Sequence, residues 1–441
     1  LDKCDFSRFK NYLDGEKVKK HSRSREEKKR EKEDRELIQE NFKYATVDDK
    51  IQQVGNFVME PPSIFLGRGC NPNLGKVKRR IYPKDITLNL SRNAKIPSLP
   101  PGEKWGKIVH DKGKIWLASW KDSITGNTKY VWLAQSSEFK RESDQSKFDL
   151  ARKLSKKLNE IIHENESSLA SSNKKMRQIA TAVYFIYKLA LRVGNEKGKD
   201  EADTVGVTSL RIEHLKLLEN NVVKLDFLGK DSIRYQKKVT VDPIVYRNLE
   251  EFTKNKSKRE EIFDKISSKD INEYLKKLMP GLTSKVFRTA IASRTFQKQL
   301  DRLGKMNKEE NVKVLLNKIQ QANAAVALVC NHQKKVSKSF DNQIAKLDEQ
   351  IKNQQDKIKG LGSRRRSTRG KSRGRSRSKT NTLKTAREKL KELKIRKQTK
   401  IDMKNVSVNT SKSNYIDRRI IMAFIKKNGI DVVHVNGNPD H

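Results

Sequence analysis

The chain has 441 residues, 34% of them hydrophobic and 34% charged, and its 98 Lys and Arg against 54 Asp and Glu give a formal net charge of +44. This length allows about two to four domains with buried cores, and the charge predicts a polyanionic partner, with nucleic acid favoured over an anionic membrane. Three widely spaced cysteines argue against a disulfide framework or a zinc site, and no apolar run is long enough to span a bilayer. Because the chain begins at Leu1 rather than Met, we expect that part of a longer protein lies N-terminal to it.

The first segment is dense in charge. Residues 17–35 alternate acidic and basic side chains at helical spacing, with few apolar positions. This pattern predicts a solvated helix on the surface rather than a helix that reads DNA.

Glycines and basic residues then combine over residues 67–81. Gly69 and Gly75 are one residue too far apart for a Walker A loop, and Val77 stands where that loop needs Ser or Thr. Pro72 replaces the third glycine of a dinucleotide fingerprint. We therefore expect neither an ATP nor an NAD site, and interpret this turn as one that suits close approach to a DNA backbone.

Residues 81–135 have the pattern of β-structure. Apolar residues alternate over 86–90, and runs at 115–120 and 130–133 flank Gly126, which marks a hairpin turn. The hairpin contains three of the four tryptophans, and we interpret them as core residues rather than base-stacking platforms: Trp116, Trp120 and Trp132.

From residue 138 the pattern becomes helical. One helix is predicted over 148–163, and a second is capped by Asn173. A strand is predicted at 222–228, and further helices are expected to carry residues 285–289 and 330–333.

Residues 335–403 show near-heptad spacing in two runs, which begin at Phe340 and Leu383. Between them lies an Arg/Ser/Gly tract, 363–379, with no apolar residue. This predicts a coiled-coil hairpin of two antiparallel helices with a disordered basic tip, because the tip has no apolar area to bury.

Tyr415 lies in a polar, basic run ahead of an amphipathic segment at 420–427. A phenol has a pKa of about 10 and is a poor nucleophile without nearby cations. Four cation-capable residues are candidates to serve it, although each alone has an ordinary solvated or structural interpretation: Arg192, Lys230, Arg288 and His332.

Taken with their flanking residues, these positions resemble the eukaryotic type IB DNA topoisomerase family. The matching motifs are 189–196 around Arg192, 227–235 around Lys230, 285–289 around Arg288, 330–333 around His332 and 411–417 around Tyr415. The runs 65–69 and 78–81 match that family's DNA-clamping lobe, and the resemblance covers residues 4–427. The chain departs from the family at Arg418, where proline is usual, and in its Arg/Ser-rich tip.

The resemblance implies roles for individual residues. Tyr415 is the expected nucleophile, Arg192, Arg288 and His332 the donors to the non-bridging phosphate oxygens, and Lys230 the general acid. The expected DNA contacts are Arg68, Lys78, Arg79, Arg80, Lys129, Asp231, Asn414 and Lys412, and three of these (Arg68, Asp231 and Asn414) would lie where camptothecin-type poisons bind. Neither a cofactor nor a metal is expected, and the expected partner is double-stranded DNA bound by a monomer in the nucleus.

The implied fold class is α+β and mostly helical. A β-containing DNA-clamp lobe (1–137) would precede a helical, tyrosine-recombinase-like catalytic domain (138–334). A coiled-coil linker hairpin (335–403) and a small helical C-terminal domain with the nucleophile (404–441) would follow. Two other functions are weighed beside relaxation of supercoiled DNA: a site-specific tyrosine recombinase and a non-catalytic basic chromatin-binding protein.

Overall fold

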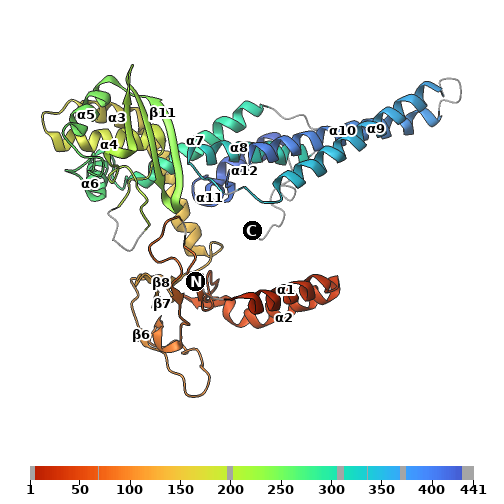
Figure 1. The fold of residues 1–441 in the computed structure, drawn as a ribbon, viewed down its shortest axis with the longest axis horizontal. Coiled ribbons are helices and arrows are strands. Elements are labelled where there is room, and N and C mark those ends of the chain that lie inside the picture. Colours follow the sequence, from red (N-terminus) through yellow and green to blue (C-terminus); the bar gives the residue numbers. More distant parts are fainter. Residues whose placement is uncertain are drawn as a thin grey trace. The chain divides into compact units, whose positions relative to one another are not determined.

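The computed structural model describes residues 5–67, 69–195, 202–304, 312–334, 336–367 and 374–429. The chain is mostly helical with small sheets, as predicted, and divides into two units (Figure 1). The first unit comprises Leu1–Leu66 and Asn73–Asp144, and the second comprises Gly67–Pro72 and Gln145–His441. None of the helices in the described part of the chain has the length and hydrophobicity that crossing a bilayer requires.

The charge-dense segment of the first unit forms two helices rather than the one predicted. Helix α1 (Ser7–Ser22) ends just before α2 (Arg25–Lys43) begins. Ser24 starts the second helix with a capping box, in which its Oγ accepts from the Glu27 N–H (3.0 Å) and its own N–H donates to the Glu27 carboxylate (2.6 Å). Helix α1 buries no residue, so the prediction of a solvated surface is confirmed.

The first unit also contains three small sheets. β1 (Tyr44–Val47) pairs with β2 (Lys50–Gln53), and β3 (Ser63–Ile64) pairs with β4 (Val77–Lys78), both antiparallel. A four-stranded sheet has the order β6-β5-β7-β8, built from Lys107–Val109, Thr87–Asn89, Ala118–Lys121 and Thr128–Val131. The predicted hairpin is confirmed as β7 and β8, which turn at Gly126 with φ +69°.

The tryptophans of this hairpin are less buried than predicted. Trp116 and Trp120 are partly buried, whereas Trp132 is 42% exposed. Trp116 and Trp132 both lie against the Tyr130 ring, with centroids 5.7 and 5.3 Å away. The prediction of a core position is wrong for Trp132, because this residue follows the last residue of β8 and packs on Tyr130 at the surface.

The second unit places a three-stranded antiparallel sheet among helices. The sheet has the order β11-β10-β9, from Ile233–Thr240, Val222–Gly229 and Leu215–Leu218, which confirms the strand predicted at 222–228. Asn173 caps α4 as predicted, since its side chain accepts from the N–H groups of Lys175 and Met176. The helices of this region are α3 (Glu138–Leu169), α4 (Lys174–Leu189), α5 (Pro243–Thr253), α6 (Ser268–Leu278), α7 (Ser284–Leu303) and α8 (Val312–Val329).

Helix α4 lies at the centre of the core. Ten of its sixteen residues are buried. Phe185 of this helix packs edge-on against Phe263, which in turn contacts Phe252. Each of these rings is fully buried, and burying one stabilises the fold by about 1.5–3 kcal/mol.

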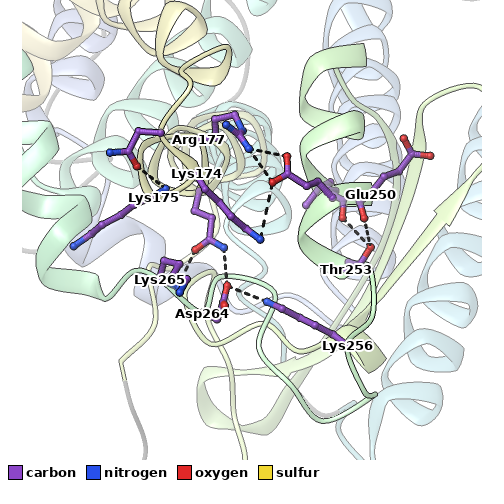
Figure 2. A network of polar contacts seen from close by, with 12 residues as sticks. Lys174, Lys175, Arg177, Glu250, Thr253, Lys256, Asp264 and Lys265 are labelled. Atoms are coloured by element: carbon purple, nitrogen blue, oxygen red, sulfur yellow. Dashed lines mark hydrogen bonds and ion pairs between the residues drawn. The ribbon is translucent and has the colours of Figure 1, made fainter.

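A polar network fixes the N-terminal end of α4 to α5 and to the loop that follows it (Figure 2). Arg177 donates two hydrogen bonds to the Glu251 carboxylate, at 2.8 and 2.7 Å. The buried Gln178 donates to Asp264 (2.7 Å) and accepts from the Lys265 N–H (2.9 Å), and Asp264 also pairs with Lys256. The network thus anchors the N-terminal end of α4, and residues 190–195 follow directly after its other end.

Helices α9 (Phe340–Ser367) and α10 (Gly374–Asp402) lie side by side as the predicted hairpin (Figure 1). Leu347, Leu383 and Leu393 are buried at heptad-type positions, and Gln354 donates to the Ala386 carbonyl across the pair (2.9 Å). Both helices extend into residues 363–379, so the prediction of a disordered tip over that whole range is wrong. Residues 368–373 lie outside the described residues. The chain then forms α11 (Val408–Asn414) and α12 (Arg418–Asn428), which confirms the amphipathic segment.

Candidate active site

Tyr415 immediately follows α11, at a tight turn. Its N–H donates to the Ser411 carbonyl at 3.0 Å, and its own carbonyl accepts from Ser293 Oγ at 3.0 Å. The residue is only 5% exposed. The Tyr415 backbone is therefore held at its N–H by α11 and at its carbonyl by α7.

Arg192 reaches the phenol from the loop after α4. Its Nη1 donates to Tyr415 Oη at 3.2 Å. The helix stops because Ala190 takes a left-handed conformation (φ +53°), and the loop then bonds through the Arg192 carbonyl to the Val207 N–H (2.9 Å). Gly206 packs against the loop so closely that a Cβ there would lie 2.8 Å from the Arg192 carbonyl oxygen. The position of Arg192 thus depends on the absence of a side chain at residue 206.

Arg288 lies in the interior of the site, on α7 as predicted. Its guanidinium donates to the carbonyls of Ala190 and Cys330 and lies over the Tyr415 ring, 5.3 Å from the centroid. The residue is 5% exposed, and its buried Nε has no hydrogen-bond partner among the described residues. A buried donor left without a partner is costly, and an anion entering the site would satisfy it.

No carboxylate among the described residues forms an ion pair with Arg192 or Arg288. Two guanidinium groups that lack an acidic partner are unfavourable beside a buried phenol. They are favourable once a phosphate joins them, because its oxygens match the fork of an arginine. The arrangement is that of an anion site.

His332 completes the cluster. The predicted helix over 330–333 is wrong, because α8 ends at Val329 and Asn331 has a left-handed backbone (φ +53°) that turns the chain. The His332 ring is 5.4 Å from the Tyr415 ring between centroids and 8% exposed. Burial, with the charges of Arg288 and Arg192, lowers the pKa of this imidazole to about 4, so it is neutral at neutral pH.

The arginines also change the acidity of the Tyr415 phenol. Burial raises the pKa of the Tyr415 phenol, but the charges of Arg192 and Arg288 and the Arg192 hydrogen bond more than offset it, so the pKa lies below 10. A lower pKa increases the fraction of phenolate available for attack.

Lys230 stands apart from the other four. It is exposed at the turn between β10 and β11, where Asp231 and Ser232 have positive φ angles of 67° and 55°. In the part of the chain that the structure describes, its ammonium has no hydrogen bond or ion pair. Gly69 packs directly against Ser232 beside this turn, and Arg68, the predicted DNA contact next to it, lies outside the described residues.

The predicted DNA contacts of the first unit differ in accessibility. Lys78 is 8% exposed and forms an ion pair with Glu60, and Lys129 is paired with Asp122 at 2.9 Å. Lys78 points inward because strand β4 alternates its faces, and Val77 faces outward. Arg79 and Arg80, which follow the strand, are exposed, as are Lys412 and Asn414 on α11 of the second unit.

Sequence reasoning gave no role to three residues that hold the site. Ser411 lies 2.6 Å from His332 Nδ1, and Ser293 links α7 to the Tyr415 backbone. Asp417 caps α12 and pairs with Arg152 at 3.0 Å. Only Asp417 had a recognisable signal, since an aspartate directly before an amphipathic segment is a common N-cap.

Comparison with known proteins agrees with this geometry. Residues 136–364 match the eukaryotic DNA topoisomerase I catalytic core, residues 1–133 its DNA binding fragment, and residues 387–436 a C-terminal topoisomerase domain. DNA topoisomerase 1 of Caenorhabditis elegans is 42% identical over 97% of this chain and 54% of its own length, and that of Drosophila melanogaster is 40% identical over 98% and 44%.

The human protein named DNA topoisomerase I, mitochondrial, is 39% identical over 97% of this chain and 73% of its own length. The chain spans about half the length of the first two relatives. The matches to the family's catalytic core, DNA binding fragment and C-terminal domain, together with these relatives, show that the chain belongs to the eukaryotic DNA topoisomerase I family.

Proposed function

We propose that this chain relaxes supercoiled DNA by transient single-strand cleavage through a 3′-phosphotyrosine intermediate, strand swivelling and religation, without ATP or an obligatory metal. The observation that carries the proposal is the hydrogen bond from Arg192 to Tyr415 Oη inside a cluster that also contains Arg288 and His332. The family membership of the chain supports it.

In the cleavage step, Tyr415 Oη attacks a backbone phosphorus. The bond from phosphorus to the phenolic oxygen forms and the bond to the 5′ oxygen breaks. The leaving oxygen takes a proton, which we assign to Lys230 as general acid. The exposure of this lysine at a hairpin tip suits a group that meets the DNA from outside the buried cluster.

Negative charge gathers on the non-bridging oxygens in the transition state. Arg288, Arg192 and His332 would donate to these oxygens, and removal of one such donor costs roughly 10²–10³ in rate. Arg288 brings a buried Nε–H that has no hydrogen-bond partner within the described part of the chain. Religation reverses the step with the 5′ hydroxyl as nucleophile, and the energy of the phosphodiester is kept in the tyrosine linkage.

The finer divisions of the chain are part of the proposal. Residues 1–137 would form a DNA-clamp lobe, 138–334 a catalytic domain resembling the tyrosine recombinases, 335–403 a coiled-coil linker and 404–441 the domain with the nucleophile. The exposed Arg79, Arg80 and Lys412 would hold phosphates without reading sequence. We propose a nuclear monomer, although one relative is named as mitochondrial.

Arg68, Asp231 and Asn414 would flank the cleaved base step. The backbone at Asp231 is left-handed, and the Asn414 amide donates to the Thr410 carbonyl at 3.1 Å, which fixes both at turns near the ends of their elements. The family assignment favours relaxation over the recombinase and over a non-catalytic chromatin protein.

The test is relaxation of a supercoiled plasmid in buffer that contains EDTA and no nucleotide. We expect a ladder of topoisomers from the unaltered chain and none from Tyr415→Phe. A gel-shift measurement on a duplex oligonucleotide should give the two proteins similar affinity. A strict need for metal or ATP, or substantial relaxation by Tyr415→Phe, would contradict the proposal.

A further inference from the structure

His332 has a close polar neighbour at each ring nitrogen. Nδ1 lies 2.6 Å from Ser411 Oγ, and Nε2 lies 3.3 Å from Nη2 of Arg288. The histidine is 8% exposed and Ser411 is completely buried. Both contacts are therefore made in the interior, where a donor facing a donor would be costly.

The contact with Arg288 fixes the position of the single ring proton. A guanidinium has donors and no acceptor, so the nitrogen that faces it presents its lone pair. Because the imidazole is neutral at neutral pH, its one proton is then on Nδ1. With this tautomer, Nδ1–H donates to Ser411 Oγ.

This tautomer is the wrong one for stabilising a phosphate oxygen. Nε2 faces the cluster of Arg288 and Tyr415, and a lone pair there repels an anion. To donate to a phosphate oxygen, Nε2 must carry the proton, which requires the Arg288 guanidinium to turn from Nε2 toward the phosphate. Nδ1 then becomes an acceptor in need of a donor. A hydroxyl can fill both roles by rotating about its Cβ–Oγ bond, whereas a methyl group fills neither and a carboxylate only accepts.

We propose that Ser411 is a positioning residue for His332: its hydroxyl accepts from Nδ1–H without DNA and donates to Nδ1 when a DNA phosphate is bound, which holds the proton on Nε2. The inference rests on the proposed function. The change is neutral in protons, since one leaves Nδ1 and one is gained at Nε2. The same residue accepts through its carbonyl from the N–H groups of Tyr415 (3.0 Å) and Ile416 (3.1 Å), so it joins the histidine to the backbone of the nucleophile.

The kinetic test measures single-turnover cleavage of a duplex oligonucleotide by trapping the covalent adduct with denaturant. Ser411→Ala should be about 10- to 100-fold slower than the unaltered chain, by analogy with the loss seen when the hydrogen-bond partner of a metal-binding histidine is removed. Ser411→Asp should be slower still, because it stabilises Nδ1–H, and Ser411→Thr should recover most of the rate. The control is Ser155→Ala, whose helical hydroxyl donates to the Ala151 carbonyl away from the site.

A double-mutant cycle separates action through His332 from a general packing effect. If Ser411 acts through the histidine, Ser411→Ala should cost less than about twofold in a His332→Ala background. An equal cost in both backgrounds, or a rate for Ser411→Ala equal to that of the Ser155→Ala control, would overturn the inference. Failure of the unaltered chain and the control to form any adduct would overturn the proposed function, and with it the role toward phosphate.

The direct test needs no change at Ser411. ¹⁵N-labelled histidine distinguishes the tautomers by NMR, and His332→Gln identifies its signal among the seven histidines. In the Tyr415→Phe variant, we expect Nδ1–H without DNA and Nε2–H once a duplex oligonucleotide is bound. The same tautomer in both states would contradict the inference.

Discussion

The Ser293 hydroxyl donates to the carbonyl of Tyr415 at 3.0 Å, and its oxygen accepts from the N–H of Asp417 at 3.1 Å. One hydroxyl on α7 thus bonds to the backbone on both sides of Ile416. Helix α7 also carries Arg288, so Tyr415 and this buried guanidinium are both fixed to one element.

Removing this link should slow cleavage without weakening DNA binding. Ser293→Ala leaves the Tyr415 carbonyl and the Asp417 N–H without their partner and lets the phenol shift relative to Arg192. Small misplacements of this kind cost about 10- to 100-fold in rate. Single-turnover cleavage and a gel-shift titration measure the two effects, with Ser293→Thr as the variant that retains the hydroxyl. Equal rates for the alanine and threonine variants would show that the hydroxyl does not position Tyr415.

A methyl group at residue 206 should displace Arg192. In Gly206→Ala the added Cβ would collide with the backbone of Gly194 and lie 2.8 Å from the Arg192 carbonyl oxygen, so the loop must move. We expect cleavage to fall by about 10²-fold or more. The matched control is Gly360→Ala on the exposed face of α9, where a Cβ meets nothing within 4 Å, and where alanine should stabilise the helix by up to about 1 kcal/mol. Normal cleavage by Gly206→Ala would contradict the role given to this close approach.

The neutral state of His332 should make folding stability depend on pH. Its pKa is about 4 in the folded chain and about 6.5 in an unfolded one, so the unfolded state binds more protons between these values. The contribution of His332 to the free energy of unfolding is fully present above pH 6.5 and is lost as the pH falls toward 4. His332→Gln should therefore show a shallower decline of the urea midpoint between pH 6.5 and 4 than the unaltered chain. Parallel pH profiles of the two proteins would argue that His332 is not held neutral.

Asp417 should contribute to stability as the cap of α12. Its carboxylate accepts from the Arg419 N–H at 2.9 Å and from Arg152 Nε at 3.0 Å, and it is 3% exposed. Asp417→Ala should lower the free energy of unfolding by about 1–2 kcal/mol, and Asp417→Asn by less, because asparagine still caps. Urea unfolding followed by circular dichroism measures both.

The control is Asp356→Ala, which removes an exposed pair with Lys359 and should cost less than about 0.5 kcal/mol. Losses of equal size at the two positions would mean that the cap contributes nothing.

Local pattern predicted much of the fold. Asn173, the strand at 222–228, the hairpin at Gly126 and the amphipathic segment at 420–427 each have a signal within a few residues, and each is present. The break between α1 and α2 was missed because Ser24 and Glu27 lie inside a run whose charge pattern continues unchanged on either side.

The site was predicted less completely, because its contacts join distant parts of the chain. Arg192 and Tyr415 are 223 positions apart, and the residues around each give no indication that the two are in contact. Resemblance to a family selected these residues, and the structure brings four of the five together. The inward orientation of Lys78 depends on the pleat of β4, and the link through Ser293 depends on the packing of α7, so neither was predictable from composition.

The central claim is that Tyr415 becomes bonded to the 3′ phosphate of the cut strand. The measurement is a pair of denaturant-trapping reactions on one duplex, with the scissile strand labelled at its 5′ end in the first and at its 3′ end in the second, followed by mass mapping of the labelled peptide. We predict that only the 5′-labelled strand stays with the protein and that the label lies on the peptide containing Tyr415. Label retained from the 3′ end, or found on a peptide without Tyr415, would contradict the account.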